Sequence, residues 1–212
     1  MKRILFVLSM LLVLLIAVSA PADQITYQLT VPNDAISPYP APYADVLVNL
    51  TSSTTAIVTF TANGTYTYLI GAAQATDLNV NGTFTVSGLT SANGWTVSGD
   101  FPKVGSGTAD GFGNFNLTID NKDGWGNAAS VLSFLLTDTG GTWASASNVL
   151  VPNSNGYLAA AHIFVPNPTG GGAIATGFAA NGPPIPEPAT MLLLGSGLIG
   201  LAGFARKRFR KD

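Results

Sequence analysis

The segment from residue 44 to residue 70 reads ADVLVNLTSSTTAIVTFTANGTYTYLI, and its apolar side chains recur at every second position. Side chains alternate between the two faces of a β-strand, so this spacing is typical of strands that bury one face. Asn-Gly supplies the positive φ angles of a tight turn, and Asn63-Gly64 stands between two threonine-rich stretches, Thr59-Phe60-Thr61 and Thr65-Tyr66-Thr67. The segment therefore predicts β-strands, with a hairpin turn at Asn63-Gly64.

The same alternation continues on the C-terminal side of this segment, and no window of 12 residues before the C-terminal tail has the apolar spacing of a helix. Further Asn-Gly and Asp-Gly pairs stand at residues 81–82, 93–94, 110–111, 123–124, 155–156 and 181–182. The stretch from Ser130 to Leu136 is more continuously apolar, as expected of a strand that is buried on both faces. This pattern predicts an all-β fold, an antiparallel β-sandwich, for which a jelly roll is one arrangement.

Two segments rich in proline or glycine interrupt the strand pattern. Residues 31–42 contain four prolines and are expected to cross one edge of the sandwich, whereas residues 166–184 contain Gly170-Gly171-Gly172 and are expected to form a linker. A last strand is expected inside this linker, near Ile174 to Phe178. The predicted organisation is a signal peptide at 1–22, a β-sandwich domain at 23–165, a linker at 166–184 and a C-terminal segment at 185–212.

The N-terminus has the pattern of a secretory signal peptide. Lys2 and Arg3 precede an apolar run from Ile4 to Val18, and small residues follow. Cleavage after Ala22 is favoured, because Ala20 and Ala22 supply the pair of small side chains. An uncleaved membrane anchor is the alternative, although the run is short for crossing a bilayer.

The C-terminal segment has the pattern of a membrane span. Residues 189–205 carry no charge, and as a helix these 17 residues would extend about 25 Å, close to the roughly 30 Å of a hydrocarbon core. Arg206, Lys207 and Arg208 follow directly, and positive residues stay on the cytoplasmic side of a membrane. We therefore expect a transmembrane helix at 189–205 that is stopped by a basic tail at 206–212 and leaves the β domain outside.

Pro186-Glu187-Pro188 stands just upstream of this span, and two prolines there favour an extended strip that a peptidase groove can bind. The three parts in order resemble the PEP-CTERM sorting signal, a tail also labelled ice-binding protein C-terminal domain, over Ile185 to Lys211. Family members often have Val where this chain has Ile185. The resemblance implies an exosortase, a membrane Cys peptidase, as processing partner, with Pro186, Glu187 and Pro188 as recognition or cleavage positions. A rigid stalk before a permanent anchor is the alternative.

The composition excludes several classes of function. Charged residues make up 9% of the chain, against about 25% in ordinary soluble proteins. Between Asp23 and Glu187 two lysines stand against ten acidic residues, which gives a net charge of −8 and argues against a nucleic-acid partner. The chain has no cysteine, so disulfides, thiolate nucleophiles and cysteine-based metal sites are excluded.

Two turn regions contain candidate ligands for a cation. Asp110 and Asn114 lie in one glycine-rich stretch, and Asp120 and Asp123 lie in the next. Oxygen ligands on such turns suit Ca²⁺, but neither stretch matches an EF-hand loop, and Asx-capped turns are the favoured reading. No other cofactor is expected. The only histidine, His162, has apolar neighbours and is expected to be structural, so we predict no enzymatic activity.

The three tryptophans, Trp95, Trp125 and Trp143, are expected to pack in the core, although glycines flank Trp125. Together the sequence predicts an exported cell-surface or extracellular-matrix protein that is sorted through its tail and associated with exopolysaccharide, the polymer made by bacteria that carry such tails. A secreted carbohydrate-binding module is the alternative, and an exposed planar row of aromatic side chains would distinguish it. A secreted hydrolase would need a cleft that holds His162 or two Asp carboxylates.

Overall fold

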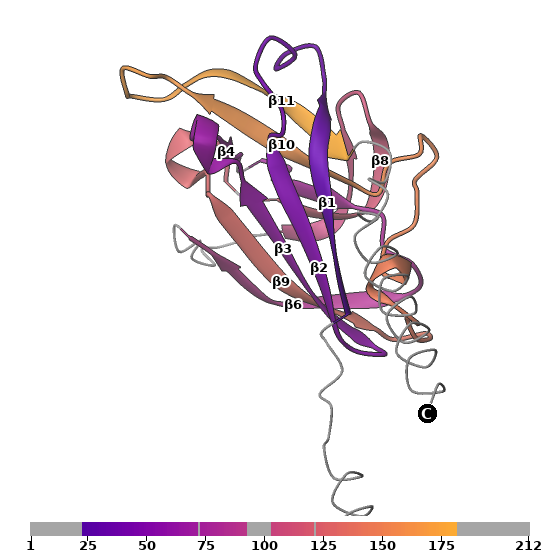
Figure 1. Cartoon of the computed structure of the whole chain (residues 1–212). Helices are drawn as coiled ribbons and strands as arrows, with labels where there is room; N and C mark the ends of the chain where they lie inside the picture. The colour runs from indigo at the N-terminus through magenta and orange to yellow at the C-terminus, as the bar shows by residue number, and fades with distance from the viewer. Residues whose placement is uncertain (1–22, 72, 93–102, 121, 182–212) are drawn as a thin grey trace, which may run out of the picture.

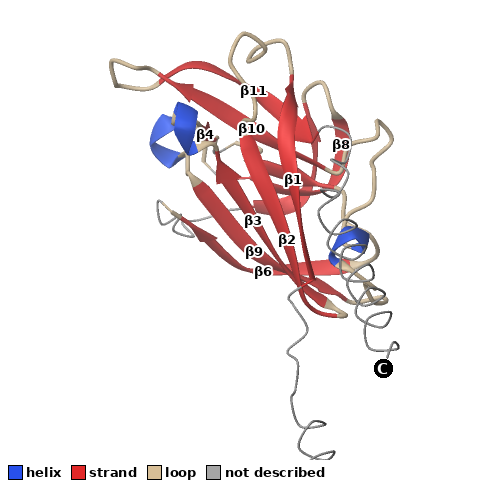
Figure 2. Cartoon of the chain, viewed as in Figure 1, coloured by secondary structure: helices blue, strands red, loops and turns tan. Residues whose placement is uncertain are grey.

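The fold comes from a computed structural model of the chain, which describes residues 23–71, 73–92, 103–120 and 122–181. The signal peptide expected at 1–22, the span expected at 189–205 and the basic tail at 206–212 lie outside these residues. Strands make up most of the described chain (Figure 2). They are β1 (Asp23–Pro32), β2 (Ala44–Ser52), β3 (Thr55–Ala62), β4 (Leu69–Ile70), β5 (Thr76–Leu78), β6 (Phe84–Ser91), β7 (Lys103–Ala109), β8 (Gly113–Asp120), β9 (Val131–Asp138), β10 (Ala159–Pro166) and β11 (Ala173–Asn181). Three short 3₁₀ helices are η1 (Gly64–Tyr66), η2 (Trp125–Asn127) and η3 (Ala146–Asn148).

The strands form one antiparallel sheet with the order β6-β9-β3-β2-β1-β11-β10-β5-β8-β7, and β4 pairs with β10 at its side. The all-β antiparallel class is therefore confirmed. The two separate sheets of a sandwich are not what the described residues form, because hydrogen bonds continue from β1 to β11 without a break. In Figure 1 β10 and β11 cross behind the layer of β1, β2 and β3 at an angle.

Strand β1 is the corner at which the sheet changes direction. Its residues from Asp23 to Leu29 pair with β2, whereas Leu29 to Pro32 pair with β11. A register shift between Leu29 and Val31 separates the two pairings. Such bulges bend a strand and increase its twist, which lets one sheet fold over and enclose a core on its inner face.

The inner face of the sheet encloses the main hydrophobic core. Val58 and Phe60 of β3 and Phe134 of β9 are at most 1% exposed, and they pack in one cluster with Leu117 of β8 and Ile163 of β10. Every second residue of β3 and β9 is buried, as the alternation of the sequence predicts. The apolar stretch from Ser130 to Leu136 is thus buried on one face only, and the prediction of two buried faces is wrong for it.

The hairpin expected at Asn63-Gly64 is also wrong. After β3 the chain enters η1, and the partners of β3 are β2 and β9. The Asn63 side chain accepts a hydrogen bond from the Thr65 amide at 2.9 Å and donates one to the Pro42 carbonyl at 2.8 Å. The side chain thus caps a helical turn and connects it to a distant loop. Such side-chain hydrogen bonds of Asn compete with the hairpin turn that Asn-Gly otherwise favours.

Strand β11 occupies the middle of the sheet. It lies between β1 and β10 and pairs with β10 from Ala160↔Ala180 to Pro166↔Ala173. The strand expected near Ile174 to Phe178 is therefore present, and the sheet continues past Val165, where the sequence places the end of the β domain. The last residue of β11 also holds the start of β10, since the Asn181 side chain accepts hydrogen bonds from the amides of Leu158 and Ala159 at 2.7 and 3.0 Å.

Candidate functional site

The four residues predicted as cation ligands are spread along strand β8. Asp110 and Asn114 lie at the β7–β8 turn, whereas Asp120 ends the same strand. At about 3.4 Å per residue the two ends of β8 are roughly 24 Å apart, so one ion cannot bind all four side chains. All four side chains already accept hydrogen bonds: Asp110 from the Asn33 side-chain amide, Asn114 from Thr108, Asp120 from the Gln74 amide and Asp123 from the Gly124 amide.

Among the described residues no group of three or more His, Asp or Glu side chains is placed to hold a metal ion. At Asp123 the side chain accepts a hydrogen bond from the amide of the next residue, Gly124, which has a positive φ of 113°. The Asp110-Gly111 pair does form the predicted turn, with a φ of 86° at Gly111 between β7 and β8. The Asp110-Gly111 turn is therefore as the sequence predicts, but the four side chains are not brought together.

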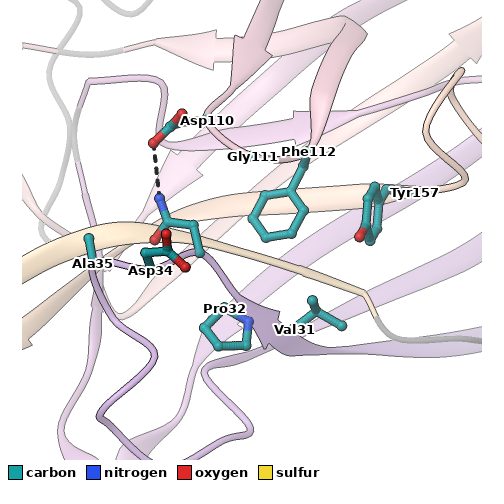
Figure 3. A pocket seen from close by; sticks show the side chains of 9 residues that line it. Val31, Pro32, Asp34, Ala35, Asp110, Gly111, Phe112 and Tyr157 are labelled. Carbon is teal, nitrogen blue, oxygen red and sulfur yellow. Dashed lines mark hydrogen bonds between the residues drawn. The ribbon is translucent and has the colours of Figure 1, made fainter.

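A pocket lies at this β7–β8 turn, with a volume of about 480 Å³ (Figure 3). Its walls come from three segments distant in sequence: residues 31–35 after the β1 corner, residues 110–112 of the turn, and Tyr157 before β10. Asp34 and Asp110 lie on one side, and the rings of Phe112 and Tyr157 lie on the other. The Asn33 side chain donates a hydrogen bond to the Asp110 carboxylate at 3.2 Å, which joins two of the three segments.

Asn153 fixes the third segment. Its side-chain amide donates to the carbonyls of Phe112 and Asn114 at 3.0 and 3.1 Å. Its side-chain oxygen accepts from the amides of Asn155 and Tyr157 at 2.9 and 3.0 Å. One side chain therefore holds the β7–β8 turn against the loop that carries Tyr157, so the pocket is built before any ligand binds.

The substitution Asn153→Ala is expected to lower the free energy of unfolding by about 2 kcal/mol, because four hydrogen bonds of modest net value are lost together. Asn155→Ala is the matched control. The Asn155 side chain is exposed and accepts only a long hydrogen bond within the described residues, from the Ser154 hydroxyl at 3.4 Å, so a change of less than about 0.5 kcal/mol is expected. Urea denaturation of both variants measures the difference, and equal midpoints would show that Asn153 does not hold the two loops together.

A second small core lies beneath this pocket, on the opposite face of the sheet from the main core. It contains Phe112 and Phe115 near the β7–β8 turn and Phe178 of β11, together with small alanines, and Tyr157 packs against it. The rings of Phe112 and Tyr157 meet edge to face, with centroids 4.9 Å apart and an angle of 82°. This packing anchors both rings that line the pocket.

Asp77 is a fully buried carboxyl on β5. The Thr118 hydroxyl donates a hydrogen bond to its Oδ1 at 2.5 Å, and its Oδ2 has no hydrogen-bond partner among the residues that the structure describes. Burial raises the pKa of Asp77 from 3.8 to about 7, the Thr118 hydrogen bond lowers the pKa, and the nearby Asp120 carboxylate raises it. The fold therefore favours the protonated form of this carboxyl.

His162 is partly buried among aromatic rings. Its ring stacks on Phe178 at 4.8 Å and meets Phe164 edge to face at 5.0 Å. Burial lowers the pKa of His162, while a hydrogen bond between Nδ1 and the Ala73 carbonyl at 2.8 Å and the charge of Asp123 raise it. These contacts are those of a packed, hydrogen-bonded side chain.

The tryptophans differ in their surroundings. Trp143 is 2% exposed and its Nε1 donates to the Asn81 carbonyl at 2.9 Å, so its core position is confirmed. Trp125 is half-buried and stacks on Phe164, with centroids 6.1 Å apart and planes 9° apart. Trp95 lies outside the described residues. Phe164 and Phe178 are buried, so the described chain has no exposed planar row of aromatics built from these rings.

Sequence reasoning missed most of the pocket. Asp110 was singled out as a cation ligand, but Asn33, Asp34, Tyr157 and Asn153 carried no local signal that would connect them. Asp77 was also missed. Its alternation with Thr76 and Leu78 indicates only a strand, and its burial depends on strands that are distant in the sequence.

The residues expected to direct sorting, Pro186, Glu187 and Pro188, lie outside the described residues, as do Arg206, Lys207 and Arg208. Within the part of the chain that the structure describes, no helix is long and apolar enough to cross a membrane.

Residues 184–208 match the family described as the PEP-CTERM protein-sorting motif. No curated protein and no solved structure matches the chain. The match confirms the resemblance over residues 185–208, and it indicates a protein that is exported and sorted to the cell surface as the substrate of an exosortase.

Proposed function

We propose that the chain is a non-enzymatic protein of the cell surface or extracellular matrix, that an exosortase cleaves its tail, and that the β domain then associates with exopolysaccharide. The sorting motif at residues 184–208 is the observation that carries this proposal. The precursor is held in the membrane by the uncharged span at 189–205, and the basic tail stays in the cytoplasm. Cleavage near Pro186 to Ala189 separates the β domain from this anchor.

The properties of the β domain support an extracellular role without catalysis. It is acidic and lacks both cysteine and arginine, which suits a soluble surface and no nucleic-acid partner. Its histidine is packed between rings. The pocket at the β7–β8 turn favours the second candidate, a secreted carbohydrate-binding module, because sites for small ligands are concave and combine apolar walls with a few polar groups.

Replacing Pro186, Glu187 and Pro188 together with alanine is expected to abolish cleavage of the tail in a host that has an exosortase. The peptidase would lose the extended strip that the prolines fix and the one carboxylate in it. Mass spectrometry of the mature protein measures the outcome. The wild type should end near Pro186 to Ala189, and the variant should keep its tail and remain in the membrane fraction.

The matched control is Ser196→Ala, which changes the span and leaves the recognition residues intact, so normal processing is expected. A wild-type protein that keeps residues 189–212 would instead support the permanent anchor. Association with exopolysaccharide is tested separately, by comparing the native host with a strain that cannot make the polymer. The processed protein should move from the matrix to the medium in that strain, and an unchanged distribution would contradict the association.

A further inference from the structure

The pocket at the β7–β8 turn is preformed and has the size of a ligand site. Its volume of about 480 Å³ lies within the roughly 300–1,000 Å³ of small-molecule sites. Asn33 joins β1 to the turn, and Asn153 joins the turn to the Tyr157 loop. Gly113 has a φ of 87°, a conformation that favours glycine, and it lies next to the Asn155 side chain of the other loop. Binding therefore needs little ordering of the walls.

The charge of the pocket selects against anionic ligands. Asp34 and Asp110 both line it, and neither of the lysines in the described chain, Lys103 and Lys122, does. An acidic ligand would meet two carboxylates without a compensating cation. A neutral ligand rich in hydroxyl donors would instead find carboxylate acceptors in exposed, accessible positions.

The opposite wall is apolar. Tyr157 presents a half-buried ring held by the second core, Phe112 packs against it and is only 2% exposed, and Val31 and Pro32 continue the same wall (Figure 3). A ligand that matches both walls has hydroxyl groups on one side and C–H groups on the other. A pyranose ring has this division, because its equatorial hydroxyls surround two faces made of C–H bonds.

A bare cation fits the pocket less well. Ca²⁺ takes about six to eight oxygen ligands, whereas the side chains of this pocket offer two carboxylates, one of which already accepts a hydrogen bond from Asn33, and the Asn33 side-chain oxygen. No cluster of three acidic or histidine side chains exists in the described chain. The apolar wall would also have no role in a cation site.

We propose that this pocket binds one neutral pyranose unit of a polysaccharide, with Asp34 and Asp110 accepting hydrogen bonds from its hydroxyls and Tyr157 covering a C–H face. This proposal rests on the proposed function, because it assigns a site and a sugar class to the exopolysaccharide association. It predicts discrimination against uronic-acid polymers by the two carboxylates.

The test is affinity electrophoresis of the exported protein in gels that contain dextran, starch, galactomannan or, as the anionic probe, alginate. We expect at least one neutral polymer to retard the wild type and alginate to have no effect. Asp34→Asn, Asp110→Asn and Tyr157→Ala should each weaken the retardation about tenfold. Asp34→Asn should disturb the stability of the fold least of the three, because the exposed Asp34 side chain makes no hydrogen bond in the described chain. Asp123→Asn removes a carboxylate from another turn and should change nothing.

Three results would overturn the proposal. Retardation that is equal in the wild type and in the three pocket variants would place sugar binding elsewhere and leave the proposed function intact. Retardation lost on adding EDTA would indicate a cation site. No retardation by any neutral polymer would exclude a neutral pyranose site. The proposed function would then be tested only by the retention of the protein in the matrix of the native host.

Discussion

The substitution Asp77→Asn is expected to raise the free energy of unfolding above pH 7 by up to about 4 kcal/mol and to change it little at pH 4. Burial raises the pKa of Asp77 from 3.8 to about 7, so the folded protein favours the protonated carboxyl. The stabilising contribution of that proton is complete below about pH 4 and is lost as the pH rises through about 7. Three pKa units correspond to about 4 kcal/mol, the largest effect that this shift allows. Asn stays neutral throughout and can still accept the Thr118 hydrogen bond.

Chemical denaturation followed by tryptophan fluorescence at several pH values between 4 and 8 measures this effect. The wild type should lose stability across the range, whereas Asp77→Asn should show a nearly flat profile. Asp34→Asn serves as the control, because it removes an exposed carboxylate and should follow the wild type. Profiles of wild type and Asp77→Asn that run parallel would mean that Asp77 does not resist ionisation in the fold.

The all-β class could be predicted because it depends on local alternation. The side chains of β3 and β9 alternate in burial as their sequences do. The number of sheets could not be predicted in this way, because it depends on pairing between distant segments. The bulge between Leu29 and Val31 transfers pairing from β2 to β11, and nothing near those residues distinguishes such a corner from an ordinary strand.

Turn residues predicted the local backbone conformation better than they predicted which segments pair with each other. Asp110-Gly111 forms a hairpin turn as predicted, with Gly111 at positive φ. Asn63-Gly64 instead caps η1, because the Asn63 side chain finds both the Thr65 amide and the Pro42 carbonyl. The Pro42 partner lies 21 residues upstream. The conformation of Asn63-Gly64 therefore depends on a contact with a distant residue, which the dipeptide sequence alone does not reveal.

In the candidate site, too, local features could be predicted and long-range contacts could not. Asp110 was recognisable as a polar residue on a glycine-rich turn, but its pocket depends on Asn33 and Tyr157, which approach it only through the curvature of the sheet. The sorting tail could be recognised in full, because its three parts follow one another in sequence and none depends on tertiary contacts. The match at residues 184–208 confirms it.

A chain of residues 23–165 is expected not to fold, whereas a chain of residues 23–181 should unfold cooperatively. The shorter chain lacks β11, which pairs on both sides, with β1 and with β10. Its removal leaves two rows of backbone groups unpaired inside the sheet, and it takes Ala179 out of the main core and Phe178 out of the second core. It also removes Asn181, the acceptor for the amides of Leu158 and Ala159. Near-ultraviolet circular dichroism and thermal melts measure the difference.

These losses exceed the stability that a domain of this size has in reserve, about 5–15 kcal/mol in total. Each unpaired buried backbone group alone costs about 1–3 kcal/mol, and a whole strand contributes several. A strand at the edge of the sheet could be removed at lower cost, because one side of it already faces away from any partner. The glycines just before β11 therefore form a turn between two central strands, and the domain must extend at least to Asn181. A cooperative melt of the chain ending at Val165 would show instead that β1 and β10 can close the sheet by themselves.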